Sequence, residues 1–180
     1  MKAAQDLFDL INMQEAECLN VRNSEQAIAR VIKQFNNSES IESDVDEQIL
    51  LFIPFTQKVK LYSIHVFGPD DGTSPKDIKL FVNRRDIGFS DVNDLRPIQQ
   101  LTLSDDDVVN GEEIKLRYVL FQNVDSLVIF IQNNQADSPN TIVHRISLFG
   151  MPAVDTNMSD FKRVSGQQGE ENPVMFGGMN

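Results

Sequence analysis

Few side chains in this sequence are of a type and spacing that catalysis requires. The chain has two histidines, His65 and His144, and neither is accompanied by a Gly-x-Ser-x-Gly nucleophile elbow. Acid–base and nucleophilic catalysis both need a base held beside the group that it deprotonates. A lone histidine without such a partner is more often a structural or surface residue. The sequence therefore predicts no catalytic residue and no enzyme activity.

The single cysteine, Cys18, limits the chemistry further. Dithiol exchange needs an attacking and a resolving thiol, so it cannot occur within this chain. Zinc sites need several cysteine or histidine ligands at recognisable spacing, and one cysteine with two distant histidines does not provide it. We expect Cys18 to be a small buried apolar side chain, and we expect no metal and no cofactor.

Calcium is the metal that the sequence comes nearest to binding. With Asp106 in the first position of an EF-hand loop, Val108 takes the third and Arg117 the twelfth, where a bidentate glutamate is required. The EF-hand motif therefore fails. Ser104 explains the same acidic residues as the cap of a short turn, although an ion held by Asp105–Asp107 on another kind of loop stays open.

The charge of the chain is strongly negative and unevenly distributed. The formal net charge is -11, which repels a phosphate backbone, so we expect no nucleic-acid partner. Acidic residues gather between 39 and 47 and again between 105 and 113. Two interpretations stay open for these runs: solvated loops, or surfaces that steer the protein toward a basic patch on a partner.

Features of export and membrane insertion are missing from the sequence. No apolar run approaches the about 20 residues that a membrane helix needs, because Lys58 and Lys60 interrupt the longest candidate. The first residues, MKAAQDLFDLINMQEAE, lack the uninterrupted apolar segment of a secretory signal. With a single cysteine as well, the sequence predicts a cytoplasmic and nuclear protein with no membrane partner.

Between residues 45 and 150 the chain consists of short runs rich in Val, Ile, Leu, Phe and Tyr, separated by turn-forming residues. We expect a tight connection at Thr56–Gln57, a bulge or sheet edge at Pro54, and a hairpin between the two strands of residues 114–132. The predicted strands are 49–55, 58–67, 77–83, 98–103, 114–122, 126–132 and 142–149.

Two helical patterns precede the strands, in residues 3–11 and 23–35, and each places its apolar residues on one face. We expect these faces to pack on the protein's own sheet, with a groove for a partner as the alternative. No helix-length segment separates consecutive strands, so parallel βαβ connections are unavailable. The sequence predicts an all-β fold, an antiparallel jelly-roll β-sandwich with short N-terminal helices.

The pattern predicts four parts of the chain. Residues 1–44 form an N-terminal helical segment on the sandwich, 45–150 the sandwich itself, 151–170 an extension of the domain, and 171–180 a disordered tail. The tail ends with Val174, Met175, Phe176 and Met179. Either these residues are a short linear motif that folds on a partner, or they are chance composition at a flexible end.

Several ordered blocks of the sequence resemble the PITH domain, the C-terminal module of proteasome-interacting thioredoxins. They are DEQILLFIPFTQKVKLYSI from residue 46, GPDDGTSPKDIKLFVN from 68, LRYVLFQNVDSLVIFIQNNQ from 116 and TNMSDFKRV from 156, and the resemblance covers about residues 6–170. It implies a galactose-binding-like jelly roll that binds the regulatory particle of the 26S proteasome. Full-length relatives carry a thioredoxin module with a W-C-x-x-C motif before this domain. This chain has no tryptophan and one cysteine, so redox activity is not carried over to it. The chain is either a separated C-terminal domain or a short form.

Two functions follow as hypotheses. The first is a monomeric, non-catalytic module that docks on the 26S proteasome regulatory particle. The second is a small-ligand or carbohydrate-binding jelly roll, which the two tyrosines, Tyr62 and Tyr118, support poorly because both lie within predicted strands. The candidate partner-binding residues are Gly68, Pro69, Asp70, Asp71, Gly72, Phe161, Lys162, Arg163, Met175, Phe176 and Met179.

Overall fold

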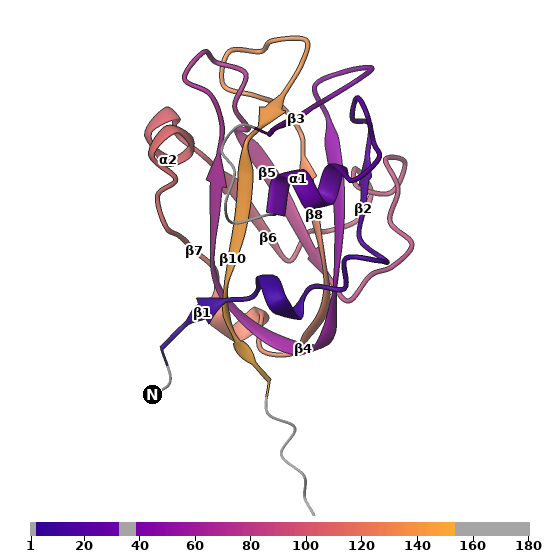
Figure 1. Cartoon of the computed structure of the whole chain (residues 1–180), viewed down its shortest axis with the longest axis vertical. Coiled ribbons are helices and arrows are strands. Elements are labelled where there is room, and N and C mark those ends of the chain that lie inside the picture. Colours follow the sequence, from indigo (N-terminus) through magenta and orange to yellow (C-terminus); the bar gives the residue numbers. More distant parts are fainter. Residues whose placement is uncertain (1–2, 33–38, 154–180) are drawn as a thin grey trace, which may run out of the picture.

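One long strand, β4 (Ile49–Phe67), connects the two layers of the protein (Figure 1). The computed structural model describes residues 3–32 and 39–153. The other elements, in chain order, are β1 (Gln5–Asp6), η1 (Phe8–Leu10), β2 (Glu17–Leu19), α1 (Ala27–Ile32), β3 (Ile41–Glu42), β5 (Asp77–Val82), β6 (Gln99–Thr102), α2 (Asp105–Asn110), β7 (Ile114–Lys115), η2 (Tyr118–Leu120), β8 (Val124–Ile131), β9 (Ile142–Val143) and β10 (Arg145–Pro152).

Eight strands form one curled antiparallel sheet in the order β1-β10-β4-β8-β5-β6, with β2 and β7 also paired to β4, and β3 and β9 form a separate two-stranded sheet. The first part of β4 pairs with β8 and its second part pairs with β10. The register of β4 against β8 shifts between Pro54 and Val59, which confirms the irregularity predicted at Pro54. The connection predicted at Thr56–Gln57 is wrong, because the chain continues there as one bent strand. The sheet thereby folds over on itself, as the predicted jelly roll requires.

The main core fills the space inside the curled sheet. Leu51 and Ile53 from the first part of β4 face it, as do Ile64 and Val66 from the second part, and all four side chains are fully buried. Leu7 and Val31 join this core from the N-terminal segment. The apolar positions before the sandwich therefore pack on the protein's own sheet, as predicted.

A second, smaller core covers the opposite face of β5 and β8. It contains Phe81, Val92, Val128 and Phe130, and the ring of Phe89 meets that of Phe130 edge-on at 6.2 Å between centroids. The segment between β5 and β6 supplies the cover. Both faces of β8 are apolar because the main core covers one face and the smaller core covers the other.

One of the two predicted helices differs from the structure. The helix predicted in residues 3–11 is reduced to the η1 turn, because Gln5 and Asp6 pair with Gly150 and Phe149 of β10. The helical pattern in 23–35 does contain α1. The boundaries predicted at 44, 150 and 170 stay predictions.

The hairpin predicted in residues 114–132 is wrong. Its first strand is only β7, which pairs with β4 through Lys115 and Ser63, while η2 replaces the remainder. Buried Leu116 and Phe121 produce a strand-like apolar pattern, and their backbone groups bond to Tyr62 and Leu61 of β4. The second predicted strand is β8, paired with β4 and β5.

The acidic segment after β6 forms a helix whose first residue is capped as the sequence suggests. Ser104 accepts a hydrogen bond from the Asp107 amide, and the Asp107 side chain accepts one from the Ser104 amide, which is a capping box. Gly111 ends α2 in the left-handed conformation, with φ of 63°. A Cβ there would overlap the ring of Phe67, so the position requires glycine.

Among the described residues, no helix has both the length and the apolar character needed to cross a membrane.

Candidate interaction surface

The turn predicted to bind a partner, Gly68–Gly72, is stabilised mainly by contacts within the protein. Gly72 has φ of +85°, and a Cβ there would lie 2.5 Å from that of Ala136. The Asp71 carboxylate accepts hydrogen bonds from the Thr73 hydroxyl and amide, and these bonds lower the pKa of Asp71. The structure thus explains the glycine at position 72 by packing.

The remaining members of this turn differ in exposure. Gly68 is buried against Ser74, and Pro69 is half-buried. Asp70 is exposed, as is Asp71. Their role in partner binding stays a prediction.

The other predicted binding residues cannot be placed. Phe161, Lys162, Arg163, Met175, Phe176 and Met179 lie outside the residues that the structure describes. Their proposed contacts stay predictions.

Neither histidine lies in a catalytic arrangement. His65 Nδ1 is 2.9 Å from the Gly111 carbonyl oxygen, and its ring packs 4.9 Å from that of Phe149. His144 uses its backbone amide to bond the Phe67 carbonyl at the end of β4. Their observed contacts are structural.

Cys18 is buried, as predicted, on β2. Burial raises the pKa of its thiol to about 12, although the nearby charge of Arg30 acts in the opposite direction. A thiol that holds its proton so firmly is a poor nucleophile and a poor metal ligand. In the described ranges, no group of three metal-ligating side chains comes together.

The acidic triplet of α2 has an explanation that needs no ion. Asp107 receives hydrogen bonds from both the amide and the hydroxyl of Ser104, at 2.8 and 2.7 Å. Asp105 and Asp106 are exposed in the first turn of the helix. Acidic residues at that position interact favourably with the helix dipole.

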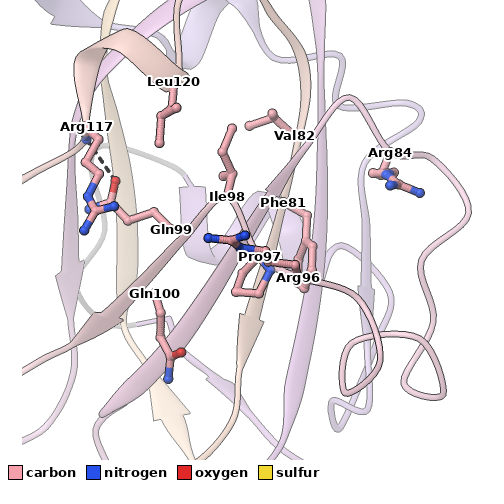
Figure 2. A pocket seen from close by; sticks show the side chains of 10 residues that line it. All are labelled: Phe81, Val82, Arg84, Arg96, Pro97, Ile98, Gln99, Gln100, Arg117 and Leu120. Carbon is pink, nitrogen blue, oxygen red and sulfur yellow. Dashed lines mark hydrogen bonds between the residues drawn. The ribbon is translucent and has the colours of Figure 1, made fainter.

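A groove that the sequence did not predict lies between the end of β5, the start of β6 and η2 (Figure 2). Its volume is about 890 Å³. None of the described residues that line it is acidic, although the whole chain has a net charge of -11. The lining residues are Phe81, Val82, Arg84, Arg96, Pro97, Ile98, Gln99, Gln100, Arg117 and Leu120. We name this feature the arginine groove.

The arginines of the groove are not used to hold the fold together. Arg84, Arg96 and Arg117 are all exposed. Within residues 3–32 and 39–153, none of their guanidinium groups forms an ion pair or a hydrogen bond. Figure 2 shows Arg96 and Arg117 on either side of Gln99, with Arg84 set apart. Two positive charges therefore flank the start of β6.

Exposed apolar side chains adjoin the arginine groove. In η2, Tyr118 is 46% exposed, Val119 79% and Leu120 41%. Leu120 also lines the groove, so the apolar surface and the arginines are continuous. The ring of Tyr118 packs on that of Tyr62, 5.1 Å between centroids. We name Tyr118–Leu120 the apolar step.

Contacts with rigid strands hold the groove and the step in place. The Gln99 side chain of β6 accepts a hydrogen bond from the Arg117 amide at 2.9 Å. Phe121, which follows the step, is fully buried and its carbonyl accepts from the Leu61 amide of β4. The exposed side chains are therefore presented by an ordered backbone.

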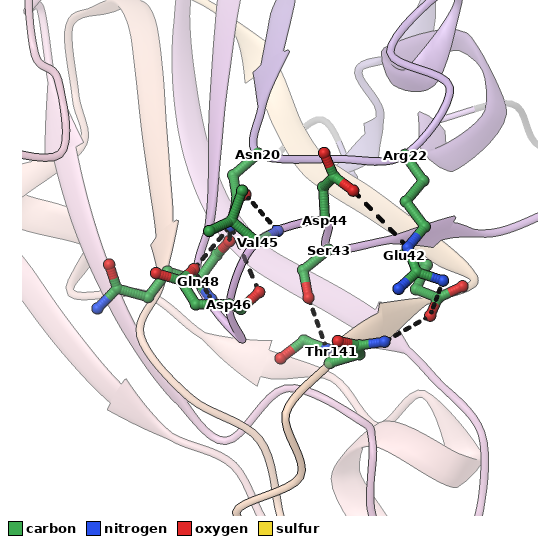
Figure 3. Close-up of polar contacts among 10 residues, drawn as sticks. Asn20, Arg22, Glu42, Ser43, Asp44, Val45, Asp46, Gln48 and Thr141 are labelled. Atoms are coloured by element: carbon green, nitrogen blue, oxygen red, sulfur yellow. Dashed lines mark hydrogen bonds and ion pairs between the residues drawn. The ribbon is translucent and has the colours of Figure 1, made fainter.

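The first acidic run, in contrast, is bonded into a polar network (Figure 3). Asn20 donates to the Asp46 carboxylate at 2.7 Å and to the Gln48 carbonyl at 2.6 Å, and it accepts from the Val45 amide. Arg22 forms an ion pair with Glu42 at 3.0 Å. These residues fasten the chain after β2 to the chain before β4.

The same network extends to the segment between β8 and β9. The Thr141 hydroxyl donates to the Glu47 carbonyl at 2.6 Å, and its amide donates to the Ser43 hydroxyl at 2.9 Å. Asn134, which is fully buried, bonds to Ser138, Asn140 and Thr141. The acids of 42–47 thus belong to a structural network. Whether they also steer a partner stays open.

Comparison with known sequences shows a family relationship along most of the chain. The profile of the PITH domain matches residues 1–166. Thioredoxin-like protein 1 of Schizosaccharomyces pombe is 34% identical over 174 residues, which are 91% of this chain and 57% of that protein. PITH domain-containing protein 1 of Xenopus laevis is 33% identical over 147 residues, 80% of this chain and 69% of that protein. This chain thus spans little more than half of the first relative.

Solved structures resemble this protein in fold. The F5/8 type C domain of a Bacteroides fragilis protein matches with a TM-score of 0.58 at 12% identity, covering 83% of this chain and 97% of that domain. The CBM32 domains of Clostridium perfringens ZmpB, solved with GalNAc, match with a TM-score of 0.58 at 14% identity, covering 82% and 36%. At such identities the likeness concerns the fold alone, and it confirms the predicted galactose-binding-like jelly roll.

Proposed function

The chain belongs to the PITH domain family, and from this we propose that it is a non-catalytic protein-binding module that docks on the regulatory particle of the 26S proteasome. The family relationship supports the choice of partner, because this family is the one whose thioredoxin-linked members are expected to bind proteasomes. The relative from Schizosaccharomyces pombe, a thioredoxin-like protein, is consistent with that choice.

The observation that carries the binding function is the meeting of the apolar step with the arginine groove. Protein interfaces combine apolar and aromatic side chains with arginine, and a few such residues supply most of the binding energy. Tyr118, Val119 and Leu120 expose apolar area without a described contact that uses it, and Leu120 borders the arginines. The histidines and Cys18 offer no comparable chemistry.

The scaffold suits a docking role because it presents these residues rigidly. Fixed side chains lose less entropy on binding than mobile ones do. Phe121 anchors one end of the apolar step in the core, and Gln99 holds the backbone of Arg117. We further propose that the module acts as a monomer in the cytoplasm and nucleus.

Binding to purified proteasome particles tests the function. The immobilised chain is incubated with regulatory particles, and in parallel with isolated 20S core particles. We expect the regulatory particle to be retained and the core particle to be lost in the wash. If neither particle is retained at micromolar concentration, or if only the core is retained, the proposal is wrong.

The prediction that the tail contributes to binding is tested in the same assay with a truncated chain. A chain without residues 171–180 lacks Met175, Phe176 and Met179. We expect weaker retention of regulatory particles, because apolar residues at a chain end can act as adaptable anchors. Equal retention would remove the tail from the binding site and leave the domain as the docking element.

A second candidate function, carbohydrate binding, has one observation in its favour. Tyr118 lies in the exposed η2 turn and packs on Tyr62, so the expectation that both tyrosines lie within strands is wrong for Tyr118. Exposed aromatic rings can form a platform for a sugar. A glycan array tests this function: a specific signal that Tyr118→Ala abolishes would favour it, and a silent array would eliminate it.

A further inference from the structure

The inference concerns which surface docks and what it recognises, and it rests on the proposed function as a protein-binding module. We propose that the arginine groove binds an extended acidic segment of a partner protein, and that an apolar side chain of this segment packs on the apolar step.

Charge is the first argument for an acidic occupant. Three arginines and no acidic side chain are among the described residues that line the groove, in a chain whose net charge is -11. The groove thus carries positive charge on a negative protein, and the guanidinium groups of Arg96 and Arg117 have no described polar partner. Arginine pairs with carboxylates through two parallel hydrogen bonds, which gives both strength and orientation.

The open edge of the sheet is the second argument, and it points to an extended occupant. β6 is the last strand in the order β1-β10-β4-β8-β5-β6, so one of its edges has no strand neighbour in the described part of the chain. Gln99 and Gln100 of this strand line the groove. Extended peptides commonly bind by adding a strand to such an edge, where main-chain hydrogen bonds provide affinity.

The apolar step is the third argument, and it sets the composition of the occupant. Leu120 faces the groove, and Val119 beside it is 79% exposed. A purely acidic segment would leave this apolar area in water. A segment with one large aliphatic residue among its acids would cover it and pair with the arginines at the same time.

A nucleic acid would also bring negative charge, but the whole molecule disfavours it. The net charge of -11 repels a polyanion that extends beyond a short groove. A short acidic protein segment needs to match only the local positive charge. We therefore assign a protein segment to the groove and include an oligonucleotide in the test.

The main experiment measures retention of regulatory particles by charge-reversed variants. Arg96→Glu combined with Arg117→Glu should weaken binding at least about tenfold, because two attractive contacts become repulsive. The matched control is Arg85→Glu, in which an exposed arginine of the same loop loses its 3.0 Å ion pair with Glu15. It should change binding less than about threefold, since exposed pairs contribute little.

A folding control accompanies these variants. Arg96 and Arg117 have exposed side chains, so the double variant should unfold at the same urea concentration as the unmodified chain. If the unmodified chain retains regulatory particles and the folded double variant binds equally well, the groove is not the docking surface, while the proposed function stands. If the unmodified chain retains no particles, the proposed function itself fails.

A peptide probe tests the recognised chemistry independently of the proteasome. The probe is a fluorescein-labelled peptide of nine residues, with a leucine between two runs of four glutamates, and its polarisation is measured against the chain at low and at moderate salt. We expect binding that weakens as salt increases and that the double variant loses. Replacing the leucine by glycine should weaken binding about threefold to tenfold.

Three results of the peptide experiment would overturn the inference. They are no binding of the acidic peptide at low salt, equal binding by the double variant, and tighter binding of a single-stranded oligonucleotide of equal charge than of the peptide. The ratio of the affinities for the leucine peptide and the glycine peptide is also measured with a Val119→Ser variant. If this ratio is the same as for the unmodified chain, the apolar step is not part of the site.

Discussion

The polar network and the arginine groove use charged residues in opposite ways. In the network, Asn20, Glu42 and Thr141 bond to neighbouring segments and hold loops of the protein together. In the groove, Arg96 and Arg117 leave their guanidinium groups without a described partner, beside exposed apolar side chains. The acidic runs are conspicuous in the sequence and the groove is not. Composition alone therefore draws attention to the acidic runs and not to the groove.

The comparison implies that changes in the two regions should have separable effects. Replacing a residue that hydrogen-bonds buried polar groups should lower the free energy of unfolding, because those groups then lack a partner. A residue of the groove or the apolar step should affect binding and leave unfolding almost unchanged. The predictions that follow are ordered by the size of the expected effect.

The largest effect concerns the thiol of Cys18, on the strand that leads into the network. Since the pKa of Cys18 is about 12 rather than 9.0, its thiolate fraction near pH 8 should be about a thousandfold lower than in the unfolded chain. We expect a thiol reagent such as DTNB to react with the native protein only after local or global opening. Reaction at the same rate with and without denaturant would contradict the buried position.

The raised pKa of Cys18 also sets the direction of a pH effect. The folded state holds the thiol proton more firmly than the unfolded state does. This contribution to stability is fully present below pH 9 and is lost as the pH rises toward about 12. The Cys18→Ala variant should show a weaker loss of stability over that interval.

Asn134→Ala should cause the next largest effect, a loss of about 3 kcal/mol in the free energy of unfolding. The fully buried Asn134 amide donates to the carbonyls of Ser138 and Asn140, and its side-chain oxygen accepts from the Ser138 amide. Urea denaturation measures the change. Asn93→Ala, at an exposed site, is the matched control and should change stability by less than about 0.5 kcal/mol.

Asp77 provides a smaller, pH-dependent effect on the strand next to β6. Hydrogen bonds from Asn133 and Thr102 lower the pKa of Asp77. The stability that they provide is present above the ordinary pKa of 3.8 and is lost as the pH falls through the lowered value. Asp77→Asn should therefore make the unfolding free energy less dependent on pH below about 4. An unchanged pH dependence would show that these bonds do not favour the charged form.

The smallest effect on stability should follow Val119→Ser, in the apolar step. Val119 is 79% exposed, so its replacement should change the unfolding free energy by less than about 0.5 kcal/mol. Binding to regulatory particles should nevertheless weaken, by about threefold to tenfold. A clear loss of stability with unchanged binding would show that Val119 stabilises the fold and does not take part in docking.

The sequence was sufficient for the fold class because its signals are local. Short runs rich in Val, Ile, Leu and Phe correctly located β5, β8 and most of β10, and Ser104 marked the start of α2. The error at Leu116–Phe121 has a physical cause: both end residues are buried, while the four residues between them are exposed. Periodicity alone does not distinguish this arrangement from a strand.

The candidate site could not be predicted in the same way. Arg96 and Arg117 are distant in the sequence and flank Gln99 because its side chain binds the Arg117 amide, while Arg84 lies apart from them. No spacing rule describes that arrangement. The predicted turn at Gly68–Gly72 did contain two special glycines, but packing against Ser74 and Ala136 explains them.

Site-specific crosslinking tests the central claim most directly. A photoreactive amino acid is placed at Val119, beside the arginine groove, and in a second protein at Val45, an 86% exposed residue of the network. Each protein is irradiated with purified regulatory particles. The account predicts a crosslink to a regulatory-particle subunit from position 119 and none from position 45. Crosslinks from position 45 alone would contradict it and would place the docking surface at the polar network.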